Sequence, residues 1–257
     1  MINFIYNQKN TFLAISAMVI GVIFIDIHGL IVKYLGGEYS TIQLALFRNT
    51  FAIIPLILLL IYNKESSDLF KNLNKKFILF CFIRGSCFLA INILYYIAIN
   101  NMEFATASTL TFSSTFFIVI LSIFFLGDRV GIYRWSAVII GFVGVVMIMK
   151  PNSSIFSYYS ILPILVAFLW AVQVIVLKFI PDNFSTGKIQ FYSLFSSFLG
   201  SLIFIFFTTG HTYIESNTDF LILSLIGIFG GTAAILFIYS YRSVSYTHLT
   251  LPTIDRV

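Results

Sequence analysis

Charged residues are scarce in this chain of 257 residues. Asp, Glu, Lys and Arg together make up 10% of it, whereas soluble domains carry about a quarter. So little polar material cannot cover a water-facing surface, and the composition therefore excludes a soluble globular fold. Intrinsic disorder is excluded as well, because disordered segments combine low hydrophobicity with high charge.

Residues that commonly carry out catalysis or bind metals are also few. The chain contains three histidines and two cysteines, and it lacks the Gly-x-Ser-x-Gly, His-Glu-x-x-His and P-loop patterns. Cys81 and Cys87 lie in one apolar stretch on different faces of a helix, so we do not expect them to pair. The sequence predicts no catalytic residue, metal site or cofactor, and it disfavours a membrane-embedded enzyme.

Long apolar stretches are what the chain has instead. Hydrophobic residues make up 59% of it, and the mean hydropathy is +0.98. Stretches of about twenty apolar residues match the thickness of a bilayer core, where a helix satisfies its own backbone groups. We therefore predict an all-α polytopic membrane protein whose partner is the lipid bilayer. The expected spans are Phe12–Val32, Ile42–Tyr62, Phe77–Ile97, Ala105–Leu126, Ile132–Ile148, Ile155–Leu177, Ile189–Thr208 and Phe220–Tyr241.

Basic residues gather on one side of this predicted bundle. With the N-terminus in the cytoplasm, ten of them fall inside, and only Lys33 and Lys150 fall outside. This bias is the one that orients membrane proteins, and it explains most of the net charge of +5 without a nucleic-acid partner. The inner residues are Lys9, Lys64, Lys71, Lys75, Lys76, Arg129, Arg134, Lys178, Lys188 and Arg242.

A weak internal repeat emerges when the chain is shifted by 145 positions. Residues 1–150 then form one unit with five expected spans, and residues 151–243 form a second unit with three. A second copy of a unit with an odd number of spans enters the membrane in the opposite orientation, as in inverted-repeat transporters. The identical positions are Lys33 and Lys178, Ser40–Thr41 and Ser185–Thr186, Gly85 and Gly230, and Tyr96 and Tyr241.

The end of the chain does not continue this repeat. Two further spans are expected after Tyr241, but residues 244–257 are polar and too short to cross a bilayer. The decapeptide Val244–Thr253 resembles the translation of a transposon end that is used as a sequencing adapter. We therefore interpret residues 244–257 as a non-native tail and expect ten spans in the authentic protein.

Several motifs resemble the EamA family of the drug/metabolite transporter superfamily. The longest is Gly127–Pro151, which joins the fourth and fifth expected spans. Two departures, Asp128 in place of Glu and Thr115 in place of Pro, leave the family resemblance intact but weaken any inference about a substrate. The branch that contains bacterial S-adenosylmethionine uptake proteins is the most similar. Shorter matching pieces are Lys33-Tyr-Leu, Phe47-Arg48, Ile83-Arg84-Gly85 and Phe112-Ser-Ser114.

The resemblance implies a carrier of five plus five helices in an inverted repeat, which works by alternating access and keeps both chain ends in the cytoplasm. It also implies a small-molecule substrate and a place in the cytoplasmic (inner) membrane of a bacterium. A homodimer, and coupling to a proton or a counter-substrate, are left open.

Three charged residues inside the expected spans are the leading substrate-binding candidates, namely Asp26, Arg48 and Arg84. Charges at membrane depth are costly and normally face a bundle interior or a wet cavity. Asp26 and Arg48 lie at similar depth in neighbouring antiparallel helices, so a structural ion pair and a substrate-binding role both stay open. Because arginine suits bidentate binding of a carboxylate or phosphate, an anionic or zwitterionic metabolite is favoured.

Polar residues at helical spacings add candidates to the third expected span. Asn92 and either Tyr95 or Tyr96 share a broad face with Arg84. This face forms either a cavity wall or a buried network of interhelical hydrogen bonds.

The remaining candidates are isolated polar residues. Ser113 and Ser114 either contact substrate or bond back to their own helix. Gln173 stands where the first unit has His28. His28 itself is not expected to share a cavity with Asp26, because the two lie about 200° apart around a helix.

The predicted function is secondary-active transport of a small anionic or zwitterionic metabolite, such as an amino acid or S-adenosylmethionine. A multidrug or metabolite exporter and a non-transporting membrane subunit are the alternatives. Charged residues inside the spans occur in the first unit only. Charges that served the fold alone would be expected in both units. This asymmetry favours a carrier.

Overall fold

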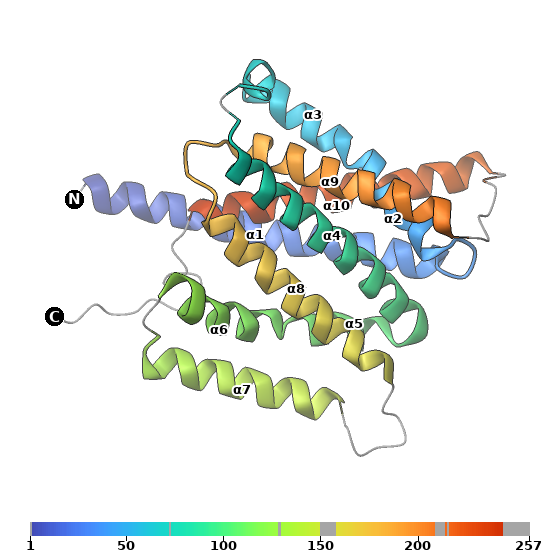
Figure 1. Ribbon diagram of the computed structural model, residues 1–257. Helices are drawn as coiled ribbons and strands as arrows, with labels where there is room; N and C mark the ends of the chain where they lie inside the picture. Colours follow the sequence, from blue (N-terminus) through green and yellow to red (C-terminus); the bar gives the residue numbers. More distant parts are fainter. Residues whose placement is uncertain are drawn as a thin grey trace.

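The computed structural model describes residues 2–71, 73–127, 130–149, 158–208, 214 and 216–243. Within these ranges the regular elements are helices, which confirms the prediction of an all-α membrane protein (Figure 1). Seven stretches of the described residues are long and apolar enough to cross a membrane. The predicted tail at 244–257 and the family position Asp128 lie outside the described residues.

Helices lie at each of the eight expected spans, and two of these spans are broken. The helix at the fifth expected span, Ile132–Met149, is not among the seven stretches counted as able to cross a membrane. The second span consists of α2 and α3, and the fourth consists of α5 and α6. The helices are α1 (Ile2–Leu35), α2 (Thr41–Phe51), α3 (Ile53–Tyr62), α4 (Lys75–Asn101), α5 (Phe104–Thr111), α6 (Ser114–Leu126), α7 (Ile132–Met149), α8 (Ile161–Lys178), α9 (Thr186–Phe207) and α10 (Asn217–Ser243).

Side-chain caps fix where several of these helices begin. Ser40 Oγ accepts a hydrogen bond from the Gln43 backbone N–H at 3.3 Å, and Ser185 Oγ accepts one from Lys188 N–H at 3.2 Å. Such caps satisfy backbone donors that the first turn leaves unpaired. Ser40 and Ser185 are among the positions matched by the shift of 145 residues, so α2 and α9 begin in the same way.

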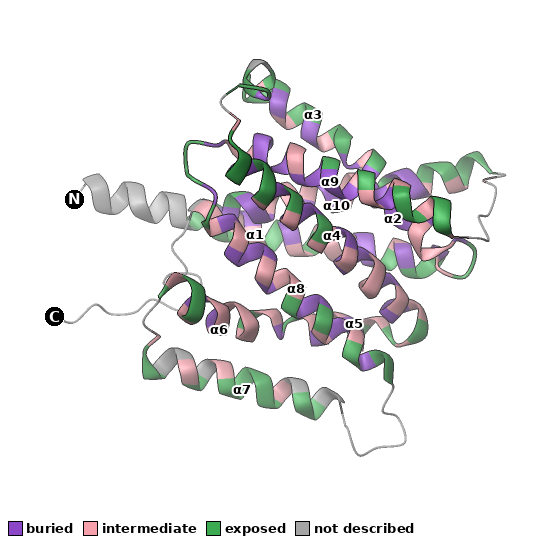
Figure 2. Ribbon diagram, viewed as in Figure 1, coloured by how far each residue is buried: buried purple, intermediate pink, exposed green. Residues whose placement is uncertain are grey.

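The outer surface of the bundle is apolar, and its interior holds polar side chains among the apolar core residues. Ile57, Leu58 and Ile61 of α3 are exposed, while Arg48, Ser197 and Ser240 are fully buried at 0% exposure. Buried residues lie along the sides of the helices that face one another (Figure 2). An apolar exterior, with the buried polar side chains confined to the interior, suits a protein surrounded by lipid.

The central helices pack in corresponding pairs. α1 packs chiefly against α10, α4 packs against α8 and α9, and α2 packs against α10. Under the shift of 145 residues α1 corresponds to α8, and α4 corresponds to α10. The contact between α8 and α4 is therefore the counterpart of the contact between α1 and α10, with the two units exchanged. In Figure 1, α1 and α8 run in opposite directions.

Gly85 lets α4 approach α9 closely. A Cβ atom at this position would clash with the Ser193 carbonyl oxygen and would lie 2.6 Å from Ser196 Cβ. We expect Gly85→Ala to lower the free energy of unfolding by about 1–3 kcal/mol, because overpacking forces the helices apart. Thermal unfolding in detergent measures the effect. Gly141→Ala, where nothing lies within 4 Å, is the control. Equal stability of both variants would contradict the close α4–α9 contact.

Candidate functional site

A cavity lies among α1, α4, α8, α10 and the broken span α5–α6. We call it the main cavity, and it provides about 180 Å³ of space for water-sized molecules. Its walls are mostly apolar and aromatic, with a few polar groups, as in typical small-molecule sites. Its polar side chains are Asp26, His28, Asn92, Tyr95, Ser108, Thr111, Ser114 and Thr115, and its other aromatic residues are Phe88, Phe112, Trp170, Phe237 and Tyr241.

Asp26 provides the carboxylate of the main cavity. It is half-buried, and its Oδ1 accepts a hydrogen bond from Ser108 Oγ at 3.3 Å. Because Ser108 belongs to α5, this bond joins two walls of the cavity. Among the described residues, Asp26 makes no ion pair with Arg48, so the predicted alternative of a structural pair is not realised.

Arg48 is fully buried between α2 and α10 and lines neither the main cavity nor the inner pocket described below. Its Nη2 donates to the Gly230 carbonyl oxygen at 3.0 Å, and its Nη1 donates to Asn49 Oδ1 at 3.2 Å. The guanidinium carbon lies 3.9 Å from the centre of the Phe88 ring, which is a cation–π geometry. Arg48 therefore joins two helices, and its position does not favour the predicted role of a substrate clamp.

His28 and Tyr96 form a second link beside Arg48. The Tyr96 hydroxyl and His28 Nε2 lie 2.7 Å apart and are hydrogen-bonded, and both side chains are buried. Tyr96 thus lies behind the main cavity, whereas His28 reaches its wall. The expectation that His28 and Asp26 do not share a cavity is wrong. The cavity wall covers a broad arc of α1. Ile25 lies within this arc, about 60° around the helix axis from His28 and about 100° from Asp26 on the other side.

The break in the fourth span lies at the wall of the main cavity. Between α5 and α6 the Phe112 N–H donates to Thr109 O, and the Ser113 N–H donates to Leu110 O, each at 3.1 Å. In these bonds the donor lies three residues after the acceptor, as in a 3₁₀-helix, instead of the four residues of an α-helix. Irregular backbone is tolerated at membrane depth where it lines a cavity. Ser114 begins α6 at this point and faces the main cavity.

Ser113 differs from its neighbour. Its Oγ donates to the Leu110 carbonyl oxygen at 2.7 Å, and the side chain is buried. The back-bonding alternative is therefore the one realised for Ser113, whereas Ser114 is placed for contact with a ligand.

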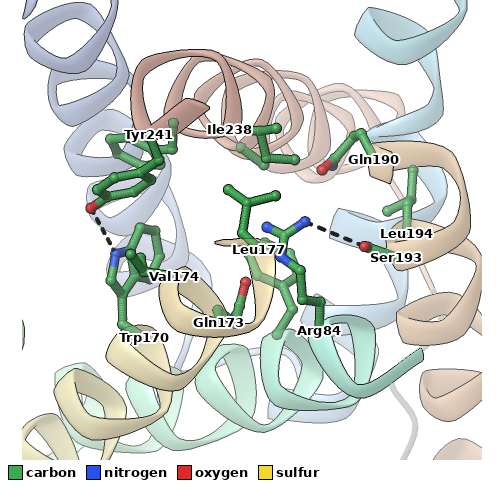
Figure 3. A pocket seen from close by; sticks show the side chains of 13 residues that line it. Arg84, Trp170, Gln173, Val174, Leu177, Gln190, Ser193, Leu194, Ile238 and Tyr241 are labelled. Carbon is green, nitrogen blue, oxygen red and sulfur yellow. Dashed lines mark hydrogen bonds between the residues drawn. The ribbon is translucent and has the colours of Figure 1, made fainter. Parts of the chain in front are cut away.

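A second, smaller pocket lies between α4, α8, α9 and α10, and we call it the inner pocket (Figure 3). It provides about 30 Å³ of space for water-sized molecules. Arg84 Nη1 donates to Ser193 Oγ at 3.4 Å, and Gln173 and Gln190 also line the pocket. Of the two alternatives for this face, a single cavity wall is therefore not realised, because Asn92 and Tyr95 line the main cavity. Arg84 and Tyr96 instead make interhelical hydrogen bonds, to Ser193 and His28.

Aromatic residues separate the two spaces. Phe88, Trp170, Phe237 and Tyr241 line both the main cavity and the inner pocket. Trp170 Nε1 donates to the Tyr241 hydroxyl oxygen at 3.3 Å, which fixes two of these rings against each other (Figure 3). The structure therefore contains two neighbouring polar sites with a common aromatic wall.

Sequence comparison agrees with this architecture. Residues 12–150 match the model of the EamA-like transporter family. The chain belongs to this family. The family is one of transporters, which confirms the resemblance seen in the sequence and the prediction of a transporter rather than an enzyme.

Curated relatives with short matching segments are riboflavin transporters. The protein from Rhizobium johnstonii is 40% identical over 63 residues, which cover 24% of this chain and 21% of the relative. The protein from Vibrio cholerae is 33% identical over 78 residues, which cover 30% of this chain and 26% of the relative. The matches thus span about a quarter of these relatives.

A solved structure supports the fold. A crystal structure, described only as that of a protein, superimposes on this chain with a TM-score of 0.65 at 16% sequence identity. The superposition covers 91% of this chain and 78% of the chain in the crystal structure. At this identity the likeness extends to the arrangement of helices alone.

Sequence reasoning did not identify several residues of the main cavity. Ser108, Thr111 and Trp170 were not among the candidates, although they lie in predicted spans. Ser108 and Thr111 stand at helical spacing from Ser114 and Thr115, within the broken fourth span. A polar stripe along this span is the signal that would have found them.

Proposed function

We propose that the protein transports a small metabolite with a flat aromatic ring across the cytoplasmic membrane of a bacterium by alternating access, and that the main cavity binds this substrate. The observation that carries the proposal is the lining of the main cavity. The aromatic residues Phe88, Phe112 and Trp170 and the polar residues Asp26 and Asn92 line the same cavity. Aromatic faces stack on flat ligands, and the polar groups fix their orientation.

The charge of the main cavity narrows the class of substrate. Its charged lining residue is the carboxylate of Asp26, whereas Arg48 and Arg84 lie elsewhere. A carboxylate attracts cationic or zwitterionic ligands and donors of hydrogen bonds, and it repels anions. Among the predicted substrate types, a zwitterion therefore fits better than a pure anion. S-adenosylmethionine, with its adenine ring and positive charge, and riboflavin, named for the curated relatives, are the first two compounds to test.

Alternating access requires two bundles that move against each other around a central site. We propose that residues 1–150 and 151–243 are the two inverted repeats of such a carrier. The corresponding contacts α1–α10 and α8–α4 support the proposal, as do the matched caps at Ser40 and Ser185. Residues of both proposed repeats line the main cavity, which supports a substrate site between the repeats, as in inverted-repeat transporters.

Equilibrium binding to the purified chain in detergent tests the proposal. The panel contains riboflavin, S-adenosylmethionine, adenosine and non-aromatic amino acids. We expect saturable binding of at least one aromatic compound. We also expect that cells that overproduce the protein accumulate or export the same compound. Phe112→Ala is expected to weaken binding about fivefold or more, because a stacked ring contributes about 1–3 kcal/mol. The absence of binding by every aromatic member would contradict the proposal.

A further inference from the structure

The inner pocket concentrates buried hydrogen-bonding groups. Arg84, Gln173, Gln190 and Ser193 line it, and each side chain is less than one-tenth exposed, at 8%, 6%, 4% and 7%. They come from α4, α8 and α9, so three helices converge on one small space (Figure 3). Groups buried this deeply normally find hydrogen-bond partners.

Gln173 indicates that the inner pocket has room for a ligand. Its Nε2 is buried and has no hydrogen-bond partner, and the side chain projects into the pocket (Figure 3). A buried amide without a partner costs free energy. A bound acceptor would satisfy it.

The charge and size of the inner pocket define that acceptor. No acidic side chain is among the thirteen residues that line it, whereas the guanidinium of Arg84 supplies positive charge and donors. The available space, about 30 Å³, exceeds the roughly 10–15 Å³ that one water needs. It is too small for a whole metabolite.

We propose that the inner pocket binds one small anion, of the size of a halide ion or a single carboxylate group. Arg84 and Gln173 donate hydrogen bonds to it, and the Ser193 hydroxyl completes the site. Anions held by a guanidinium and neutral donors form charge-assisted hydrogen bonds. The anion is either a free halide or the carboxylate of a substrate that reaches past the shared aromatic wall. The site goes beyond the proposed function, because it does not depend on which compound the main cavity binds.

Tryptophan fluorescence reports on this site. The chain has two tryptophans, and Trp170 lies in the wall shared by the inner pocket and the main cavity. In the Trp135→Phe protein all tryptophan fluorescence comes from this wall, and variants of the inner pocket show which space the iodide occupies. Iodide quenches tryptophan on contact. Iodide is titrated into the protein without substrate, and sodium sulfate keeps the ionic strength constant. We expect the quenching of Trp170 to saturate. Chloride and sodium formate are then added as competitors.

The competitors separate the two sources of the anion. Competition by chloride supports a free halide, and competition by formate alone supports a substrate carboxylate. Linear, non-saturating quenching that neither competitor relieves would overturn the proposal, even where the main cavity still binds its aromatic ligand.

Variants tie the site to its residues. Arg84→Gln, Arg84→Lys and Gln173→Leu are expected to raise the dissociation constant for iodide about tenfold or more, as each removes or displaces a donor. Gln43→Leu is the matched control, because Gln43 is a glutamine of equal exposure, 6%, that lines neither space. Size-exclusion profiles show which variants fold, and Gln173→Leu keeps the charge of Arg84 in place. An unchanged dissociation constant in folded Gln173→Leu would contradict the assignment.

Discussion

Asp26→Asn is expected to weaken binding of the aromatic substrate at least tenfold while leaving the protein folded. The change keeps the size of the side chain and its ability to accept the hydrogen bond from Ser108, but it removes the negative charge of the main cavity. A charged hydrogen bond to a ligand contributes about 1.5–3 kcal/mol, and its loss corresponds to roughly a tenfold to hundredfold rise in the dissociation constant. Equilibrium binding in detergent measures it.

Two further variants separate the charge of Asp26 from its structural role. Ser108→Ala removes the hydrogen bond and keeps the carboxylate, so we expect a smaller loss of affinity. Asp219→Asn neutralises a carboxylate in the first turn of α10, where Asp219 accepts a hydrogen bond from Tyr39, and it is expected to bind normally. Equal losses of affinity in Asp26→Asn and Asp219→Asn would indicate a general effect of net charge and would refute a specific contact.

Arg48→Ala is expected to lower the free energy of unfolding by about 3 kcal/mol, the largest stability effect that we predict. The side chain is fully buried and donates to Gly230 O and Asn49 Oδ1. Its removal abolishes both hydrogen bonds and leaves a cavity beside Phe88. Unfolding in detergent with increasing denaturant measures the change, and Lys71→Ala at an exposed ion pair is the control, with an expected change near zero.

The same residue distinguishes a structural role from a ligand contact. If Arg48 joins α2 to α10, then Arg48→Lys lowers stability and leaves the affinity of the folded fraction for substrate unchanged. If Arg48 binds substrate, Arg48→Lys lowers the affinity at unchanged stability. We expect the first result.

The spans were predictable because lipid imposes a simple requirement. Twenty apolar residues and a self-satisfied backbone are enough to locate a span, and basic loops give its orientation. Pro55 is a sequence signal for the break in the second span, because it cannot donate the helical hydrogen bond to Phe51 O. The break in the fourth span was not predictable. The fourth breaks at Phe112 and Ser113 without a proline or glycine at that point, because the cavity, and not the local sequence, makes irregular backbone tolerable there.

The candidate site was predictable in part. Depth and helical spacing led to Asp26, Asn92, Tyr95 and Ser114, which all line the main cavity. Depth alone does not tell which neighbour a side chain meets. Arg48 ends on a carbonyl of α10, which only the packing of α2 against α10 reveals.

The packing of the helices also decides which of the remaining candidates lie at the main cavity and which at the inner pocket. Arg84 and Gln173 lie on different helices, and the sequence contains no signal that α4 and α8 bring them to one pocket. Tyr96 is one residue from Tyr95 and therefore about 100° around α4, which places it behind the cavity wall against His28.

Protection of a single cysteine by substrate tests whether the ligand occupies the main cavity. Cys81 and Cys87 are first replaced by alanine, and Ser114→Cys then places a thiol on the cavity wall. Ser216→Cys, at an exposed position before α10, is the control. We expect the bound aromatic compound to slow modification of the thiol at position 114 by a water-soluble reagent at least tenfold, and to leave position 216 unaffected. Equal rates at position 114 with and without a compound that still binds would show that the substrate lies elsewhere.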